Sequence, residues 1–191
     1  MTKARLHPSL LEFSGAMGDM VFKKRNGKLY VSIKPGARTG EPTAAQAVHR
    51  ERFGEAVAYG KTVMADADIR ELYQQAAKQK GTPVFALTVA DYLNAPSIKE
   101  VDLSAYSGQL NDLIKIKASD DFGVMSVRVT ITNAQDNALI ESGDAIETGS
   151  GSGLWLYSAT NAVSNGTDVN ISVVATDRPG GTAVDTQSKA I

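Results

Sequence analysis

The sequence of 191 residues contains no cysteine and only two histidines. The missing cysteines exclude disulfide bonds, thiolate zinc sites and cysteine nucleophiles, and two histidines are too few for a multi-histidine metal centre. No run of about 18 apolar residues is present, so the sequence predicts no membrane span. Because 42% of the residues are apolar, the chain can still bury a core, which excludes wholesale disorder.

Signals for secretion and for catalysis are also missing. Leu10 and Leu11 are followed at once by Glu12, whereas a secretory signal needs about 7–15 apolar residues. We therefore expect no standard secretion signal at this end.

The sequence shows no nucleophile–base pair, no metal-ligand set and no phosphate-binding loop. It predicts that the protein is not an enzyme and uses no cofactor.

Charge is divided unevenly between the two halves of the chain. Residues 1–97 hold 14 Lys and Arg against 9 Asp and Glu, which is +5, and residues 98–191 hold 6 against 12, which is −6. This asymmetry and a change of periodicity near Pro96 predict two domains, residues 1–96 and 97–191. The basic end of one copy could attract the acidic end of another; alternatively, two domains simply have different surfaces.

The first predicted element is a β-hairpin. Asn26-Gly27 separates two runs of strand-forming residues, which is the strongest short-range hairpin signal because a type I′ turn requires positive φ at both positions. Centring the turn there pairs Met20 with Ile33, Phe22 with Val31, Lys24 with Leu29, and Arg25 with Lys28.

This pairing gives the hairpin two different faces. One face carries Met20, Phe22, Leu29, Val31 and Ile33, and the other carries Lys23, Arg25, Lys28 and Lys34 around Tyr30. Two strands alone are marginally stable in water, so the apolar face must pack on the chain's own helices or on another subunit. The basic face could grip phosphates, but the overall charge is too balanced to favour nucleic acid as a partner. Lysines that protect an exposed strand edge are the alternative.

Helical patterns follow the hairpin. Thr43-Ala44-Ala45-Gln46 matches a capping box and predicts a helix that ends near Ala65. Asp66 or Asp68 can cap a second helix, which Gly81 ends. Thr82-Pro83 suits the start of a third helix that ends near Asn94, although Val84-Phe85-Ala86-Leu87 could also form a strand.

Beyond Pro96 the apolar residues alternate, which predicts strands. The clearest runs are centred on Ile116, Val129 and Ile171, and turn signals such as Asn165-Gly166-Thr167 separate the runs. About seven short strands in this half predict an immunoglobulin-like antiparallel β-sandwich. The expected fold class is therefore α+β: an N-terminal β-hairpin with helices, followed by the sandwich.

Two motifs resemble those of bacterial immunoglobulin-like repeats. Ala118-Ser119-Asp120-Asp121-Phe122-Gly123-Val124 is similar to their "A-x-D-x-x-G-V" stretch, and the segment from Ala175 to Gly181 is similar to their "A-x-D-x-x-G-N" ending, with Gly181 in place of asparagine. The resemblance covers about half the chain and implies a fold rather than a function. Asp120, Asp121 and Asp177 raise a calcium hypothesis; the favoured alternative is that they cap turns.

The basic half resembles uncharacterised bacterial and phage-like proteins that are often structural or appendage components. The order that carries the resemblance begins with "F-S-G-x-x-G" at Phe13, continues through the basic hairpin, and includes Pro42-Thr43-Ala44-Ala45-Gln46 and Arg52-Phe53. It spans about residues 13–95. The resemblance transfers no catalytic residue. The two faces of the hairpin, the opposite charges of the halves and the immunoglobulin-like domain lead to the hypothesis of a non-enzymatic structural subunit. It would self-assemble head-to-tail into an extracellular fibre, a tube or a virion-like particle.

On this hypothesis the partner is a further copy of the chain, and the subunit-interface candidates are Met20, Phe22, Leu29, Val31, Ile33, Lys23, Arg25 and Lys28. The alternative hypothesis is an adhesin or a carbohydrate-binding accessory module whose partner is a glycan. Trp155 and Tyr157 would then stack on the sugar, although strand alternation also fits a place in the sandwich core. Immunoglobulin-like modules usually work outside the cell, so we expect an extracellular or virion-associated location.

Overall fold

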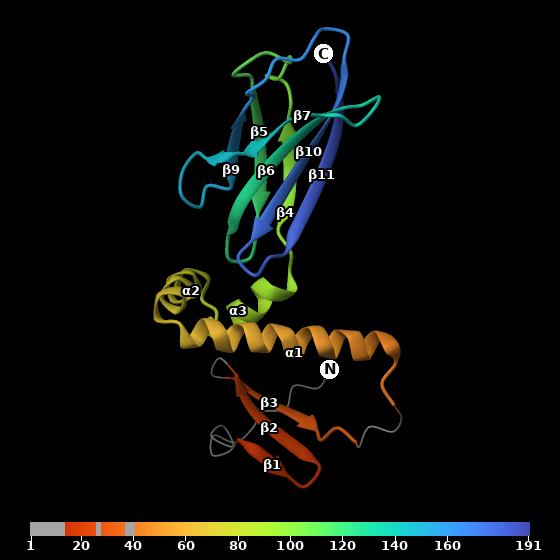
Figure 1. Cartoon of the computed structure of the whole chain (residues 1–191). Coiled ribbons are helices and arrows are strands. Elements are labelled where there is room, and N and C mark those ends of the chain that lie inside the picture. Colours follow the sequence, from red (N-terminus) through yellow and green to blue (C-terminus); the bar gives the residue numbers. More distant parts are fainter. Residues whose placement is uncertain (1–13, 26–27, 37–40) are drawn as a thin grey trace. The chain divides into compact units, whose positions relative to one another are not determined.

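The computed structural model describes residues 14–25, 28–36 and 41–191 (Figure 1). The chain forms two compact units, Met1–Thr43 and Ala44–Ile191. The first unit holds a small β-sheet, and the second holds three helices and a β-sandwich. The architecture is the α+β class that the sequence predicts. The predicted boundary between residues 96 and 97 lies inside the second unit, where the helices end and the sandwich begins.

The sheet of the first unit is antiparallel and has the order β1-β2-β3. All four residue pairs predicted for the hairpin are present, from Met20 opposite Ile33 to Arg25 opposite Lys28. The Asn26-Gly27 turn itself lies outside the described residues. A further strand, β1, joins β2 through a turn in which Gly18 has a φ of +58°, a conformation that favours glycine. The strands are β1 Gly15–Met17, β2 Met20–Arg25 and β3 Lys28–Ile33.

The three helices of the second unit follow the predicted pattern. They are α1 Ala44–Ala65, α2 Ala67–Lys80 and α3 Val84–Leu93. Asp66 caps α2, because its carboxylate accepts from the backbone N–H groups of Asp68 and Ile69 at 3.0 and 3.1 Å. Gly81 ends α2 with a φ of 64°. The stretch from Val84, for which a strand was the alternative, is helical.

A close approach at Gly60 joins α1 to α3. A Cβ atom at this position would lie 2.7 Å from Thr88 Oγ1 and 2.9 Å from Phe85 Cε2, so the two helices meet where α1 has no side chain. Val63, Tyr73, Ala77 and Leu87 form the small buried apolar cluster of this helical layer. No helix in the described part of the chain is both long enough and apolar enough to cross a membrane.

The sandwich consists of two four-stranded sheets, with the orders β11-β10-β6-β7 and β4-β5-β9-β8. Every strand pair within them is antiparallel. The strands are β4 Ser97–Asp102, β5 Leu113–Ser119, β6 Val124–Asn133, β7 Leu139–Asp144, β8 Ile146–Glu147, β9 Leu154–Ser158, β10 Asp168–Asp177 and β11 Thr182–Ala190.

The core of the sandwich confirms the alternation read from the sequence. On β5, β6 and β10 the apolar residues of the predicted runs are buried between the sheets, while Lys115, Lys117 and Arg128 are exposed. Side chains of β11 close one side of the sandwich, because Gln187 Nε2 donates to the Val101 carbonyl at 3.4 Å and Lys189 Nζ donates to the Leu103 carbonyl at 2.5 Å. A single apolar core therefore holds both sheets together.

Candidate functional site

The apolar face of the first sheet is partly exposed. The register puts Met20, Phe22, Leu29, Val31 and Ile33 on one face, as predicted, and adds Met17 from β1. Phe22 is buried, with 7% of its surface exposed, whereas Ile33 is 78% exposed. Met17, Met20 and Val31 are exposed as well. This concentration of large apolar side chains on a sheet of three short strands is typical of a surface that contacts another molecule.

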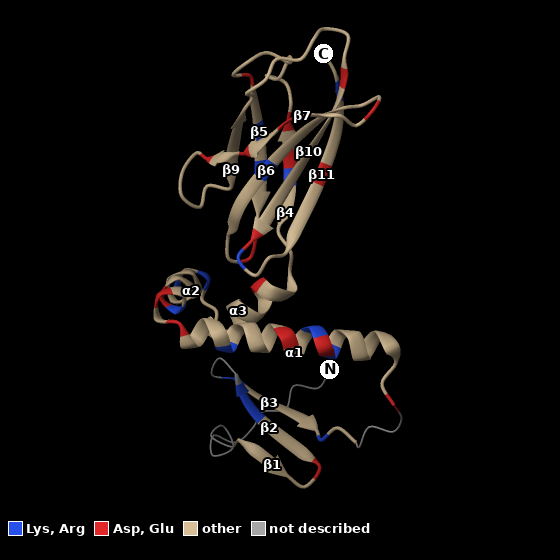
Figure 2. Cartoon of the chain, in the orientation of Figure 1, with Lys and Arg blue, Asp and Glu red and all other residues tan. Residues whose placement is uncertain are grey.

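The opposite face of the same sheet is basic. Lys23 lies opposite Tyr30, and both side chains are exposed. Arg25 ends β2 opposite Lys28, and the side chain of Lys28 is exposed. Figure 2 marks the basic residues of these strands. The predicted interface residues therefore divide between an apolar face and a basic face of one sheet.

The two aromatic residues proposed for sugar stacking lie elsewhere. Trp155 and Tyr157, both on β9, are buried members of the sandwich core. A sugar stacks on the exposed face of a ring, and neither residue presents one. Nothing in their placement favours the glycan hypothesis.

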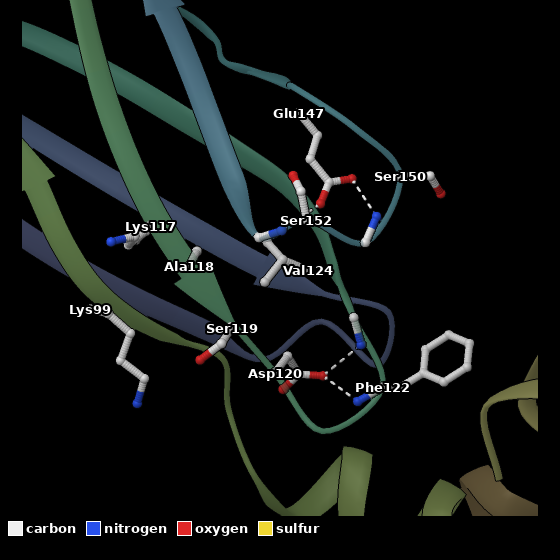
Figure 3. A pocket seen from close by; sticks show the side chains of 13 residues that line it. Lys99, Lys117, Ala118, Ser119, Asp120, Phe122, Val124, Glu147, Ser150 and Ser152 are labelled. Carbon is white, nitrogen blue, oxygen red and sulfur yellow. Dashed lines mark hydrogen bonds between the residues drawn. The ribbon is translucent and has the colours of Figure 1, made fainter. Parts of the chain in front are cut away.

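A groove lies at the edge of the sandwich, beside the loop between β8 and β9 (Figure 3). It has a volume of about 520 Å³ and is lined by Lys99, Lys117, Asp120, Glu147 and several small residues of the loop. Glu147 holds the loop, because its carboxylate accepts from the backbone N–H groups of Gly151 at 3.1 Å and Gly153 at 2.9 Å. The charged groups that line the groove are of both signs. Lys117 forms an ion pair of 3.2 Å with Glu100, which is not one of the lining residues. The groove has no arrangement of groups that matches a catalytic site.

The aspartates of the two immunoglobulin-like motifs cap turns. Asp120 accepts from the N–H groups of Phe122 and Gly123 at 2.9 and 3.1 Å, and Asp177 accepts from those of Gly180 and Gly181 at 2.8 and 2.5 Å. A Cβ at position 181 would lie 2.5 Å from Asp177 Oδ2, which explains glycine there.

The third aspartate of the calcium hypothesis has other partners. The Asp121 carboxylate accepts from Asn94 Nδ2 at 2.5 Å, and its carbonyl accepts from Lys80 Nζ. Across the described ranges, no three acidic or histidine side chains form a group that could hold a metal ion. Asp120 and Asp177 therefore have the contacts of the turn-capping alternative, whereas the Asp121 side chain contacts Asn94 of the helical layer.

A cluster of buried polar residues lies between the helices and the sandwich. Asp91 of α3 is fully buried, and the Tyr73 hydroxyl of α2 donates to its Oδ2. The hydroxyl groups of Tyr59, on α1, and Tyr73 share a hydrogen bond of 2.9 Å. One acidic side chain is thus linked to all three helices.

The sandwich covers this cluster with an aromatic ring and two acidic groups. The Phe122 ring stacks on the Tyr73 ring with a centroid distance of 3.9 Å, and the Arg178 guanidinium stands 5.6 Å from the Phe122 centroid. Asp120 and Asp177 act electrostatically on Asp91 from the same side. Burial raises the pKa of the Asp91 carboxyl to about 7, and the nearby Asp120 carboxyl adds to this rise. Burial also raises the pKa of Asp177.

Sequence reasoning missed this cluster. Asp91 follows the apolar run of the third helix and has the pattern of an ordinary surface residue, and no local pattern in the sequence gives Tyr73 a polar partner. A buried carboxylate, Glu141, was missed as well; it accepts from the N–H groups of Thr160 and Asn161 at 2.7 and 3.0 Å. Only the three-dimensional structure brings these groups together.

A distant likeness to a known protein is found among solved structures. No protein-family model matches the chain, and no curated protein matches it. Among solved structures, the crystal structure of CopC from Methylosinus trichosporium OB3b aligns with a TM-score of 0.37 and 13% identity, over 49% of this chain and 89% of that chain. The β-sandwich described above rests on the chain's own strand pairing and burial.

Proposed function

We propose that this chain is a non-enzymatic structural subunit that self-assembles through head-to-tail contacts into a fibre, a tube or a virion-like particle and displays an immunoglobulin-like domain. The observation that carries the proposal is the exposed apolar face of the β1-β2-β3 sheet. A sheet of three short strands cannot bury such residues on itself, so it gains stability by packing them against another surface. The surface proposed here belongs to a second copy of the chain.

The charge of the two compact units supports contacts between unlike ends. Residues 1–43 hold 8 Lys and Arg against 3 Asp and Glu, which is +5, and residues 44–191 hold 12 against 18, which is −6; together they give the net charge of −1. The whole basic excess thus belongs to the unit with the apolar sheet. Opposite net charges attract the first unit of one copy to the second unit of the next, and such unlike-patch contacts generate rings or filaments.

The strand order of the sandwich supports the immunoglobulin-like part of the proposal. If β4, β5, β6 and β7 are strands A, B, C and C′, then β8 to β11 are D, E, F and G, and the two sheets have the orders A-B-E-D and G-F-C-C′. This is the arrangement expected of an immunoglobulin-like sandwich. Modules of this kind usually act outside the cell, and the assembly is accordingly proposed to be extracellular or virion-associated.

Two matched substitutions test the proposal. Ile33 and Ile146 are the same residue type and are 78% and 77% exposed, but Ile33 lies on the apolar face of the first sheet and Ile146 lies on β8 of the sandwich. Full-length wild type, Ile33→Asp and Ile146→Asp are compared by size-exclusion chromatography with light scattering and by negative-stain microscopy. We expect ordered high-mass species from wild type and Ile146→Asp, and their loss in Ile33→Asp with an unchanged circular dichroism spectrum.

Val31→Asp provides a second test on the same face, because the Val31 side chain is exposed. Phe22 is buried, so Phe22→Asp would test the folding of the sheet rather than its contacts with another copy. Raising the salt concentration should weaken the assembly, since salt screens attraction between exposed charges. A monodisperse wild-type monomer at high concentration would refute the proposal. Intact polymers of Ile33→Asp and Val31→Asp would refute the role of this face.

A further inference from the structure

The buried cluster between the helices and the sandwich has an excess of acidic groups. Asp91, Asp120 and Asp177 act on one another electrostatically, and the basic group Arg178 acts on Tyr59 of the same cluster. The groups that face Asp91 are Tyr73 from α2, Asp120 from the turn after β5 and Asp177 from the end of β10, while Tyr59 from α1 contacts Tyr73. Three carboxylates cannot all be charged here without a large electrostatic penalty.

Of the three carboxyl groups, Asp91 has the weakest support for a negative charge. Asp120 and Asp177 each accept two backbone N–H bonds, which stabilise a carboxylate. Asp91 accepts from the Tyr73 hydroxyl, and no Lys or Arg in the described part of the chain forms an ion pair with it. A proton on Asp91 is therefore the least costly way to lower the charge of the cluster.

The arrangement also provides a place for that proton. Asp91 Oδ1 and Asp120 Oδ1 are buried, and neither accepts a hydrogen bond from a described residue. Two charged carboxylate groups cannot bond to each other, because the oxygens of both are acceptors. The two carboxyl groups nevertheless lie within hydrogen-bonding reach of each other. A proton on Asp91 makes its oxygen a donor to Asp120, and both buried oxygens then have a partner.

We propose that Asp91 donates a shared proton to Asp120 and that this bond is a pH-sensitive latch between the helices and the sandwich. Loss of the proton leaves two adjacent buried carboxylates that repel each other across the junction. The Tyr73–Phe122 stack and the Asn94–Asp121 and Lys80–Asp121 contacts also join the helices to the turn after β5 and would have to oppose this repulsion. This inference concerns the second unit and does not depend on self-assembly.

The direction of the pH effect follows from the raised pKa of Asp91, which is about 7 in the folded chain. The ordinary value for aspartate is about 3.9. A group whose pKa is raised by folding stabilises the folded state fully below its unfolded pKa, and this stabilisation is lost as the pH rises through the folded pKa. The latch is closed in mild acid and opens above neutral pH.

The main experiment compares wild type with Asp91→Asn, using the full chain and thermal unfolding followed by circular dichroism between pH 5 and pH 9. Asparagine keeps an acceptor for Tyr73 and a donor for Asp120 but does not titrate. The melting temperature of wild type should fall across this range, and that of Asp91→Asn should fall much less and exceed wild type at pH 9. Asp168→Asn, which removes an exposed carboxylate at the start of β10, is the matched control and should follow the wild-type profile.

Tyr73→Phe distinguishes the latch from a merely structural role. It removes the hydroxyl that donates to Asp91 and keeps the ring that stacks on Phe122. The donated bond favours the charged form of Asp91, so its loss should raise the pKa of Asp91 and move the fall in stability to higher pH. A structural role alone would lower the melting temperature equally at every pH, and that result would overturn the proposal.

Direct titration completes the test and remains available if a variant fails to fold. Carboxyl ¹³C chemical shifts of wild type should give a midpoint for Asp91 between about pH 6 and pH 8, and a midpoint near pH 4 would overturn the proposal. Calcium chloride added at pH 9 should leave the melting temperature of wild type unchanged. A calcium-dependent rise that Asp91→Asn abolishes would assign the cluster to a cation instead of a proton and would also overturn it.

Discussion

Replacing Gly60 by alanine should destabilise the second unit, although alanine is the better helix former. Gly60 lies within α1, and the added Cβ would lie 2.7 Å from the Oγ1 atom of Thr88 and 2.9 Å from a ring carbon of Phe85. Thr88 is fully buried and its hydroxyl donates to the Phe85 carbonyl at 2.8 Å, so the nearest atom cannot move away freely. Overpacking of this kind costs about 1–3 kcal/mol.

Gly54 provides the matched control, because it lies on the same helix and a Cβ there meets no atom within 4 Å. Gly54→Ala should increase stability by up to about 1 kcal/mol, the difference in helix propensity. Gly60→Ala gains the same amount and loses more through the clash. We therefore expect Gly60→Ala to be less stable than Gly54→Ala by about 1–3 kcal/mol.

Urea unfolding followed by circular dichroism measures this difference. Midpoints should move in opposite directions for the two variants while the slope stays constant, since neither substitution changes how much surface unfolding exposes. The close packing of α1 on α3 would be refuted if Gly60→Ala were as stable as Gly54→Ala.

Two further substitutions test the sandwich. Glu141→Ala leaves the N–H groups of Thr160 and Asn161 without their buried acceptor and should reduce the free energy of unfolding by about 2–4 kcal/mol. Glu141→Gln keeps one acceptor oxygen and should reduce the free energy of unfolding by less. Equal losses for the two variants, measured by urea unfolding, would contradict this account. Trp155→Ala removes a buried core side chain and should lower the free energy of unfolding by about 3–5 kcal/mol. Loss of glycan binding by that variant at unchanged stability would instead favour the carbohydrate-binding hypothesis.

The elements that could be predicted from the sequence are those that local chemistry determines. Asn26-Gly27 between two alternating runs defines the hairpin register, and the pairing of Met20 with Ile33 follows from it. Asp66 and Gly81 mark the ends of α2 because a carboxylate caps N–H groups and glycine tolerates positive φ. Period-2 alternation around Ile116 and Ile171 likewise gives strands with one buried face.

What could not be predicted depends on contacts between distant segments. β1 is only three residues long and has too few residues to show an alternating pattern. Asp91 is buried where the turn after β5 contacts the helical layer, and no local pattern in the sequence indicates that contact. The same holds for the exposed fractions of Phe22 and Ile33, which share one face of a sheet and differ from 7% to 78%.

The bonds from β11 to β4 and to the residue that follows it have a consequence for the order of folding. Gln187 and Lys189 contact carbonyl groups 86 residues earlier in the chain, whereas the Tyr59–Tyr73 and Tyr73–Asp91 bonds join residues 14 and 18 apart. Chains whose contacts are far apart in sequence fold more slowly than those with local contacts. The helical layer should therefore form early, and closure of the sandwich should limit the refolding rate. Until the strands close, the ring of Tyr73 has no Phe122 to cover it, and Asp91 meets water in place of Asp120.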